Sequence, residues 1–385
     1  MSQPYDIAAY YWPAYHDEPR WRRFMPEGQG EWQTVRQAAP KFPGHRQPRT
    51  QLWGYQDEAD PRVMEQKIDA AARHGVNVFI VDWYWYQNQP FLEDALSRGF
   101  LGARNHDQLH FYLMWANHDA TTLWDLEQSH TPQVIWPGAA DRAAFEAATQ
   151  RLIEHFFGHP AYYIIDGRPV LSIYELGTLI NGLGGLAATR DALAALRARV
   201  RQAGFPGLHL QAILWRNIPS SLGMVPGDRA PTQANTLREL GFDSLTNYQW
   251  CHYVRPTGSY QEWGEAALAA WEQWSGEFSV PFYPHVSIGW DTNPRFKAFQ
   301  PDLVTGDTPE RFAGFLQRAL DFVDARRLSP RLITLNSWNE WSEGSYLEPD
   351  RVNGFQYLEA VQNVLAQAAA GPVMPPSDQP AASRG

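Results

Sequence analysis

Eight short apolar segments recur along the chain, and a segment with helical spacing follows each of them. The apolar segments begin near residues 7, 76, 110, 168, 208, 243, 281 and 331. The segments predicted as helices cover residues 61–74, 91–101, 141–157, 187–203, 232–240, 260–277, 309–326 and 354–369. The apolar segments are continuous rather than alternating, which indicates strands buried on both faces, as in a parallel sheet.

This alternation predicts an α/β protein, a single-domain (β/α)8 TIM barrel over residues 1–370. An open doubly wound sheet is the alternative, but no glycine-rich phosphate-binding loop follows the first strand. Residues 371–385 contain four prolines and are predicted to be a disordered tail.

Charge and cysteine content argue against several functional classes. The 385 residues include 32 basic and 42 acidic side chains, a formal charge of -10, whereas a nucleic-acid binder needs a basic surface. Cys251 is the single cysteine, which excludes a disulfide framework and a cysteine-rich metal site. The sequence contains no apolar stretch of membrane-spanning length and no signal-peptide pattern at its start. We therefore expect a cytoplasmic protein that needs no cofactor and no metal.

Aromatic residues cluster where the predicted strands end, which in a TIM barrel is where active sites lie. Seven of the eight predicted strands end in one of the 17 tryptophans. An aromatic ring packs well against the CH-rich face of a sugar, and nearby polar groups can bind its hydroxyls. We therefore expect an oligosaccharide or polysaccharide substrate. The candidate substrate-binding residues are Tyr11, Asp82, Trp83, Trp115, Asn117, His118, Tyr174, Tyr248, His285, Trp290, Asp291, Asn339 and Trp341.

Two glutamates follow the last predicted strand, within residues 336–350. Glu340 and Glu343 are three positions apart and stand beside Trp338 and Trp341. Hydrolysis of a glycosidic bond needs two carboxyl groups, and a tryptophan wall raises the pKa of a neighbouring carboxyl group by desolvation. The spacing leaves their separation open, because three residues span about 5–6 Å in a helical turn and about 10 Å in a strand. These glutamates are the candidate catalytic pair.

The motif from Asn339 through Glu340, Trp341, Ser342 and Glu343 to Gly344, with Leu347-Glu348-Pro349 after it, resembles the signature of the WbsX / glycoside hydrolase family 99-like group. That group is related to endo-α-mannosidases and endo-α-mannanases. The segments Trp115-Ala116-Asn117 and Gly289-Trp290-Asp291, the latter followed by Pro294-Arg295, also look like motifs of the group. Ser342 departs from the histidine usual in endomannosidases, and Asn117-His118 departs from the Asn-Glu of the WbsX branch.

The resemblance implies a retaining α-glycosidase of mannose-like linkages that works without a metal. It implies that Glu340 removes the proton of the substrate's own 2-hydroxyl, which gives a 1,2-anhydro sugar. It implies that Glu343 is the acid for the leaving oxygen and later the base for water.

Several alternatives stay open at this level. The first is a glycosyltransferase of surface-polysaccharide (O-antigen) biosynthesis, although no Asp-x-Asp metal pair occurs in the sequence. The second is a carbohydrate-binding barrel without catalysis. The third is an ordinary retaining glycosidase that uses Glu175 and Asp291. A metal-dependent hydrolase would need His-x-His after the first strand, where Tyr-Tyr-Trp stands instead.

Overall fold

The computed structural model describes residues 4–215 and 233–370, and within them eight parallel strands form a barrel. The strands are β1 (Asp6–Tyr11), β2 (Val78–Tyr86), β4 (His110–Trp115), β8 (Arg168–Ile173), β9 (His209–Ile213), β10 (Ser244–Thr246), β12 (His285–Ser287) and β14 (Leu332–Asn336). They pair side by side in chain order, and β14 returns to pair with β1. Between β10 and β12 a single parallel bridge joins Leu245 to Phe282, and it closes the ring. The predicted TIM barrel is therefore confirmed.

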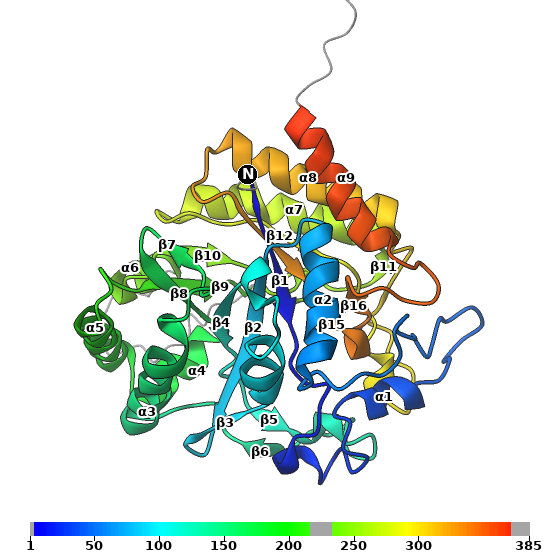
Figure 1. The fold of residues 1–385 in the computed structure, drawn as a ribbon, viewed down its shortest axis with the longest axis horizontal. Helices are drawn as coiled ribbons and strands as arrows, with labels where there is room; N and C mark the ends of the chain where they lie inside the picture. The colour runs from blue at the N-terminus through cyan, green and yellow to red at the C-terminus, as the bar shows by residue number, and fades with distance from the viewer. Residues whose placement is uncertain (1–3, 216–232, 371–385) are drawn as a thin grey trace, which may run out of the picture.

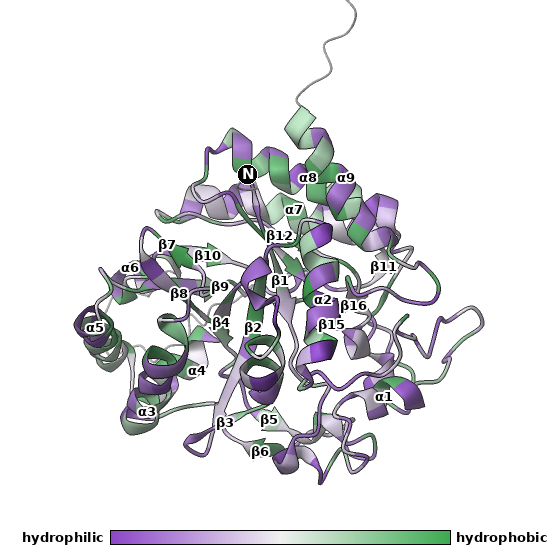
Figure 2. Ribbon diagram, viewed as in Figure 1, coloured by the Kyte–Doolittle hydropathy of each residue, from purple (hydrophilic) through white to green (hydrophobic). Residues whose placement is uncertain are grey.

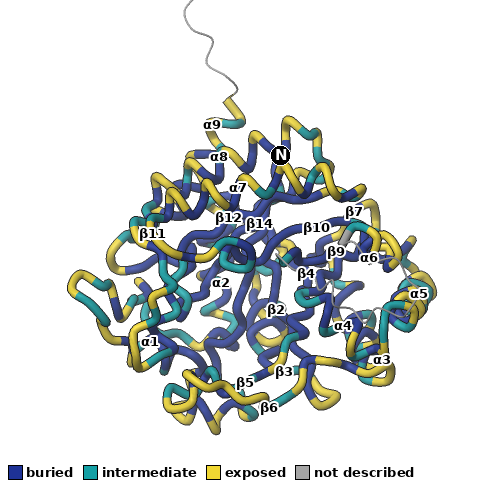
Figure 3. The backbone as a smooth tube through the Cα atoms, turned by 180° about the vertical axis from the view of Figure 1, so that it is seen from behind, coloured by how far each residue is buried: buried dark blue, intermediate teal, exposed yellow. Residues whose placement is uncertain are grey.

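Helices surround the strands, which lie at the centre (Figure 1). The long helices are α2 (Pro61–Arg73), α3 (Arg142–Leu152), α4 (Leu176–Leu183), α5 (Leu186–Gln202), α6 (Gln233–Leu240), α7 (Tyr260–Glu277), α8 (Pro309–Ala325) and α9 (Gln356–Ala370). Their outer surfaces are exposed, whereas the strands are buried along their length (Figure 3). Hydrophilic and hydrophobic positions alternate along the helices (Figure 2), as is typical of amphipathic helices that pack one face against a core. None of the helices formed by the described residues combines the length and apolar character needed to cross a bilayer.

Helix α2 shows why the sequence signals gave the right boundaries. The Asp60 side chain accepts a hydrogen bond from the amide of Arg62, and Pro61 occupies the first turn, where no amide donor is needed. Gly75 adopts a φ of +89°, a left-handed conformation that ends the helix. The other predicted helices are present, except that residues 95–100 and 153–157 form π-helical turns. The sequence did not predict α4, nor α1 (Trp32–Gln37) in the long segment after β1.

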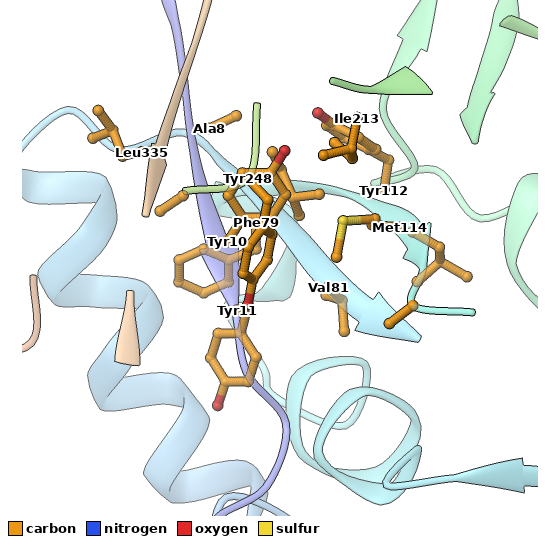
Figure 4. Close-up of a cluster of buried hydrophobic side chains, with 14 of the residues drawn as sticks. Ala8, Tyr10, Tyr11, Phe79, Val81, Tyr112, Met114, Ile213, Tyr248 and Leu335 are labelled. Atoms are coloured by element: carbon orange, nitrogen blue, oxygen red, sulfur yellow. The ribbon is translucent and has the colours of Figure 1, made fainter. Parts of the chain in front are cut away.

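The barrel interior contains many polar side chains. His285 Nδ1 lies 2.9 Å from the Thr334 hydroxyl, which lies 2.8 Å from the hydroxyl of Thr246. The Tyr112 hydroxyl donates to Gln211 at 3.0 Å. Apolar and aromatic side chains of β1, β2, β4, β9 and β14 form a buried cluster inside the barrel and between the strands and the helices (Figure 4). Buried polar groups need partners, and these pair with one another across the barrel.

Strand β1 runs from the N-terminus toward the end of the barrel that carries β3 (Gln89–Phe91), β5 (Ala120–Thr121), β6 (Val134–Trp136) and α1 (Figure 1). The hairpin of β15 (Asn339–Glu340) and β16 (Ser345–Tyr346) follows β14 directly. Candidate residues at the strand ends therefore gather at one end of the barrel. The predicted tail, residues 371–385, lies outside the described residues, as do residues 1–3 and 216–232.

Candidate active site

A cavity of about 280 Å³ lies at the C-terminal end of the barrel. Its walls combine aromatic rings with carboxyl groups and one guanidinium. The lining residues are Trp12, Asp82, Tyr84, Met114, Ala116, His118, Asp119, Thr121, Leu123, Trp124, Tyr174, Glu175, Trp215, Tyr248, Arg295, Glu340 and Glu343. An aromatic and carboxylate lining of this kind suits a polyhydroxylated ligand with apolar ring faces.

A tight turn places both glutamates on this cavity. Glu340 ends β15, and residues 341–343 form one 3₁₀ turn, in which side chains three positions apart lie on the same side. Gly344 then adopts a φ of +67°, which lets the chain reverse into β16. The Ser337 hydroxyl accepts a hydrogen bond from the Glu340 amide at 2.7 Å and fixes the start of the turn.

Arg295 binds both glutamates at once. Its Nη1 donates to Glu343 Oε1 at 2.5 Å, and its Nη2 lies 3.5 Å from Glu340 Oε2. Its Nε donates to Glu31 Oε1 at 3.0 Å. One guanidinium therefore brings the two candidate catalytic carboxyl groups together, which the sequence spacing alone had left undecided.

Tyr248 joins Glu340 to a third carboxyl group. Its hydroxyl lies 2.8 Å from Glu340 Oε1 and 2.9 Å from Asp82 Oδ2. Its ring packs against that of Tyr10, with ring centroids 4.6 Å apart. Asp82 comes from the middle of β2 and Tyr248 from just beyond β10, so opposite walls of the barrel meet here.

Burial changes the pKa of each of these acids. Desolvation raises the pKa of Glu340 well above its ordinary value, the charge of Glu343 adds to the rise, and Arg295 opposes it. Desolvation also raises the pKa of Glu343, against the effect of Arg295. The pKa of Asp82 is raised well above its ordinary value, again by desolvation first. Perturbed acids gathered in a cavity are typical of active sites.

A buried network of hydrogen bonds and ion pairs supports the turn at residues 340–344, which we call the glutamate turn. Trp341 Nε1 donates to Glu348 at 2.7 Å, and Lys67 of α2 binds both Glu348 and Glu58. The Asn339 amide group binds the backbone of Trp12 in both directions at 2.8 Å. The side chains of Lys67, Glu58 and Glu348 are fully buried. These contacts fix the turn to α2 and to the end of β1.

Eight of the fifteen predicted site residues line the cavity or form hydrogen bonds to a residue that lines it. Asp82, His118, Tyr174, Tyr248, Glu340 and Glu343 line it. Asn117 binds the backbone of Glu175 at both its amide and its carbonyl, with distances of 2.8 and 2.7 Å. Asn339 holds Trp12 in the same way, as described above.

The remaining predicted residues do not line the cavity. Trp83 Nε1 donates to Glu93 at 2.8 Å, Trp115 packs on Phe145 of α3, and the Tyr11 hydroxyl contacts Met64 of α2. These three side chains lie between the barrel and its helices, because neighbouring residues of a strand point to opposite faces and Asp82, Met114 and Trp12 occupy the inner positions.

The other four predicted residues lie in the barrel interior or in the segments that follow the strands. His285 lies in the barrel interior, Trp290 is partly buried against the core, and Trp341 binds Glu348. Asp291 accepts hydrogen bonds from the Gln47 side chain at 2.8 Å and from the Asn293 side chain at 2.9 Å. Asn293, Pro294 and Arg295 form the short 3₁₀ helix that carries the guanidinium, so the motif beginning at Gly289 positions Arg295.

The sequence prediction missed Arg295 as a site residue, although its motif was recognised. It also left out Trp12, Tyr84, Asp119, Glu175 and Trp215, which all stand at predicted strand ends. Trp215 stacks on His252 with ring centroids 3.6 Å apart. Counting alternate residues from Asp82 would have selected Tyr84 in place of Trp83. Across residues 4–215 and 233–370, no group of three or more His, Cys, Asp or Glu side chains is arranged to hold a metal ion.

Comparisons with known proteins identify the family and the fold of this chain. The family described as Glycosyltransferase WbsX matches residues 7–361. A curated relative from Xanthomonas campestris pv. campestris, named WxcX, is 28% identical over 378 residues, which is 95% of this chain and 50% of the relative. The chain thus spans about half the length of the curated relatives it matches.

Solved structures with the same fold include a GH99 endo-alpha-mannosidase from Bacteroides thetaiotaomicron, at a TM-score of 0.57 and 14% identity over 94% of this chain and 96% of that one. A glycoside hydrolase-like protein has a TM-score of 0.60 and 15% identity, with 94% of each chain covered. The chain therefore belongs to the WbsX family, and its TIM barrel has the fold of glycoside hydrolases.

Proposed function

We propose that this protein is a retaining glycoside hydrolase that cleaves an α-glycosidic, mannose-like linkage in an oligosaccharide or polysaccharide. The observation that carries the proposal is the pair Glu340 and Glu343, which share the Arg295 guanidinium on the wall of an aromatic cavity. Glycosidic cleavage needs two carboxyl groups at the scissile bond, and both glutamates line the same cavity. The mannose-like linkage is carried over from the resemblance of the Glu340 motif and from the structural neighbour, which is an endo-alpha-mannosidase.

The reaction proceeds in two displacements. Glu340 takes the proton of the substrate's 2-hydroxyl, and that oxygen forms a bond to the anomeric carbon while the glycosidic C–O bond breaks. Glu343 gives its proton to the leaving oxygen. In the second step Glu343 takes a proton from water, whose oxygen bonds to the anomeric carbon. The bond from C1 to O2 breaks, and O2 recovers its proton from Glu340. Two inversions at C1 give net retention.

The surroundings of the two glutamates fit these roles. Burial raises the pKa of Glu343, which favours the protonated acid that the leaving oxygen needs. Glu340 is 3% exposed and is held by Tyr248 and Arg295, so its orientation is fixed before substrate arrives. The rings of Trp12, Tyr84 and Trp215 supply apolar surface for sugar faces.

A glycosyltransferase is the second candidate, and the description of the matched family favours it. The charge of the cavity argues against a nucleotide-diphosphate donor. The described lining residues include five carboxyl groups and one guanidinium, Arg295, which is already shared by Glu31, Glu340 and Glu343. A diphosphate would meet like charges there. Transfer of the sugar to another sugar hydroxyl instead of water needs no change in the site.

Substitution of each glutamate tests the proposal. Glu343→Gln should lose most turnover on α-mannosides with poor leaving groups and keep more on activated aryl or fluoride glycosides, which need little protonation. Glu340→Gln should fail on both, by about 10²–10⁴-fold, because a better leaving group does not replace the base. Steady-state rates and product analysis by NMR measure the losses and the retained α-configuration.

Three outcomes would contradict the proposal. Rapid cleavage of a 2-deoxy substrate would exclude participation of the 2-hydroxyl. Release of a nucleoside diphosphate from a nucleotide sugar, without hydrolysis of any glycoside, would favour the transferase. Sugar binding by calorimetry with no turnover of any glycoside would favour a non-catalytic barrel.

A further inference from the structure

The Tyr248 hydroxyl lies between two buried carboxyl groups, and it carries a single hydrogen. Its oxygen is 2.8 Å from Glu340 Oε1 and 2.9 Å from Asp82 Oδ2. An ionised carboxylate only accepts hydrogen bonds, so Tyr248 can donate to one of the two and not to both. Both short contacts are satisfied only if one of the two acids carries a proton and donates it to the tyrosine oxygen. Three buried groups therefore share two hydrogens and one negative charge.

The charged neighbours decide which acid holds the proton. Arg295 Nη2 lies 3.5 Å from Glu340 Oε2, so a cation faces Glu340. The groups that act on Asp82 are the phenols Tyr10, Tyr84, Tyr174 and Tyr248, together with the acids Glu340 and Glu343. Burial raises the pKa of each of these phenols, which keeps them neutral. Glu340 faces the Arg295 cation as well as the carboxyl groups of Glu343 and Glu31, whereas the charged neighbours of Asp82 are both acids. The cation favours the ionised form of Glu340, and Asp82 has no such partner.

We propose that Asp82 is a neutral carboxylic acid that donates its proton to Tyr248, which in turn donates to Glu340. This inference rests on the proposed function only in giving Glu340 the role of base. Asp82 is then a positioning residue: it fixes the direction of the Tyr248 hydroxyl and keeps the Glu340 carboxylate ionised. Glu340 Oε2, which has no hydrogen-bond partner among the described residues, is the oxygen left to take the substrate's proton. Asp82 Oδ1, likewise unpartnered within the described part of the chain, is left as an acceptor for a substrate hydroxyl.

Infrared difference spectroscopy of the substrate-free protein tests where the proton lies, without any assumption about activity. The difference between wild type and Asp82→Asn at pH 7 should contain the C=O stretch of a protonated carboxylic acid. The difference between wild type and Glu340→Gln should contain carboxylate bands instead. Asp302→Asn, which removes an exposed carboxylate paired with Arg255, is the matched control and should give carboxylate bands only. An acid band that disappears with Glu340→Gln, or no acid band for either variant, would overturn the inference.

The pH profile of kcat/KM gives a second test, which a merely structural role of Asp82 would not satisfy. An asparagine can donate to Tyr248 as a neutral acid does, so Asp82→Asn should leave the acidic limb within about 0.3 pH units of wild type. A charged Asp82 would instead repel the Glu340 carboxylate, and its removal would shift the limb by about one unit toward low pH, which would contradict the proposal.

Tyr248→Phe tests the same relay without changing Asp82. It removes the donor to Glu340 and should shift the acidic limb by about one unit toward high pH. It should also move the Asp82 acid band in the infrared spectrum, because the acceptor of that proton is lost. An unmoved band would overturn the relay even if the variant is inactive. Absence of glycosidase activity in wild type would refute the proposed function while leaving the infrared result to decide the position of the proton.

Discussion

At the scale of single residues, Arg295 determines the electrostatics of the candidate site. It is the cation shared by Glu31, Glu340 and Glu343, all within hydrogen-bonding or ion-pair distance. The Arg295 side chain is 9% exposed, so water screens these interactions little. Without the guanidinium, three carboxyl groups would face one another in a buried space. Its fork geometry also holds the two candidate catalytic groups at a fixed spacing.

Arg295→Met should therefore destabilise the protein in a pH-dependent way. Loss of one partner of a buried ion pair costs about 3–5 kcal/mol of unfolding free energy. The folded-state pKa values of Glu340 and Glu343 are already raised, and loss of the cation raises them further. A carboxyl group whose pKa is higher in the folded than in the unfolded state destabilises the fold once the pH rises above its unfolded-state pKa. The loss of unfolding free energy in Arg295→Met should therefore be larger at pH 8 than at pH 5.

Urea unfolding at the two pH values measures this difference. Arg255→Met is the matched control, because Arg255 is exposed and pairs with Asp302 at the surface, and it should cost about 1 kcal/mol or less. Equal losses for Arg295→Met at pH 5 and pH 8 would show that the guanidinium does not govern the charge of the two glutamates.

At the scale of secondary-structure elements, α2 and the glutamate turn are joined through a buried ionic cluster. Lys67 on α2 contacts Glu58 at 2.5 Å and also binds Glu348, which accepts a hydrogen bond from Trp341 in the turn. Gln51 donates to the same Glu348 at 2.7 Å. Desolvation raises the pKa of Glu58 to about 7 even with the lysine beside it. The helix therefore anchors the segment that carries Glu340 and Glu343.

Lys67→Met should loosen the turn more than the barrel. Two buried carboxylates would lose their cation, which should cost about 3–5 kcal/mol. Hydrogen exchange of amides in residues 339–346 should become faster than exchange in β4 and β8 on the other side of the barrel. The double variant with Glu348→Gln, which removes one of the two negative charges, should recover part of the stability.

Lys297→Met provides the control for this change, since Lys297 is exposed and pairs with Glu127 at the surface. It should cost about 1 kcal/mol or less and leave exchange in the turn unchanged. Uniform acceleration of exchange throughout the Lys67→Met barrel would argue that the cluster stabilises the whole fold rather than the turn.

At the scale of the whole molecule, the polar interior makes the barrel sensitive to acid. His209 is 3% exposed, its Nε2 lies 2.7 Å from the Ser244 hydroxyl, and burial lowers its pKa to about 4. His285 is fully buried, and burial lowers its pKa well below the ordinary value. The folded barrel therefore favours the neutral form of both histidines. The unfolded chain binds protons at these histidines below about pH 6.5, whereas the folded barrel does not.

His209→Gln should make unfolding less sensitive to acid. A folded pKa below the unfolded value means that stability is lost as the pH falls from about 6.5 toward 4. Between pH 7 and pH 5, wild type should lose about 2 kcal/mol more unfolding free energy than the variant. Urea titrations at both pH values provide the comparison, and parallel losses in the two proteins would contradict a neutral His209 in the folded state.

The sequence by itself determined the fold class, because burial of parallel strands on both faces produces continuous apolar segments whatever their neighbours are. It also located Glu340 and Glu343, since the motif is local. Their function as a pair depends on contacts that are distant in the chain. Arg295 is 45 residues before Glu340, and Tyr248 and Asp82 come from other strands.

Only the tertiary structure decided which aromatic residues face the cavity. Trp115 ends β4 and Trp83 lies within β2, yet both side chains pack toward the helices, because the pleat sends neighbouring residues to opposite faces. Which face is inside depends on how the whole sheet closes into a barrel. The same closure places Arg295 between Glu340 and Glu343, and it places Tyr248 between Glu340 and Asp82. No local pattern in the sequence specifies either set of contacts.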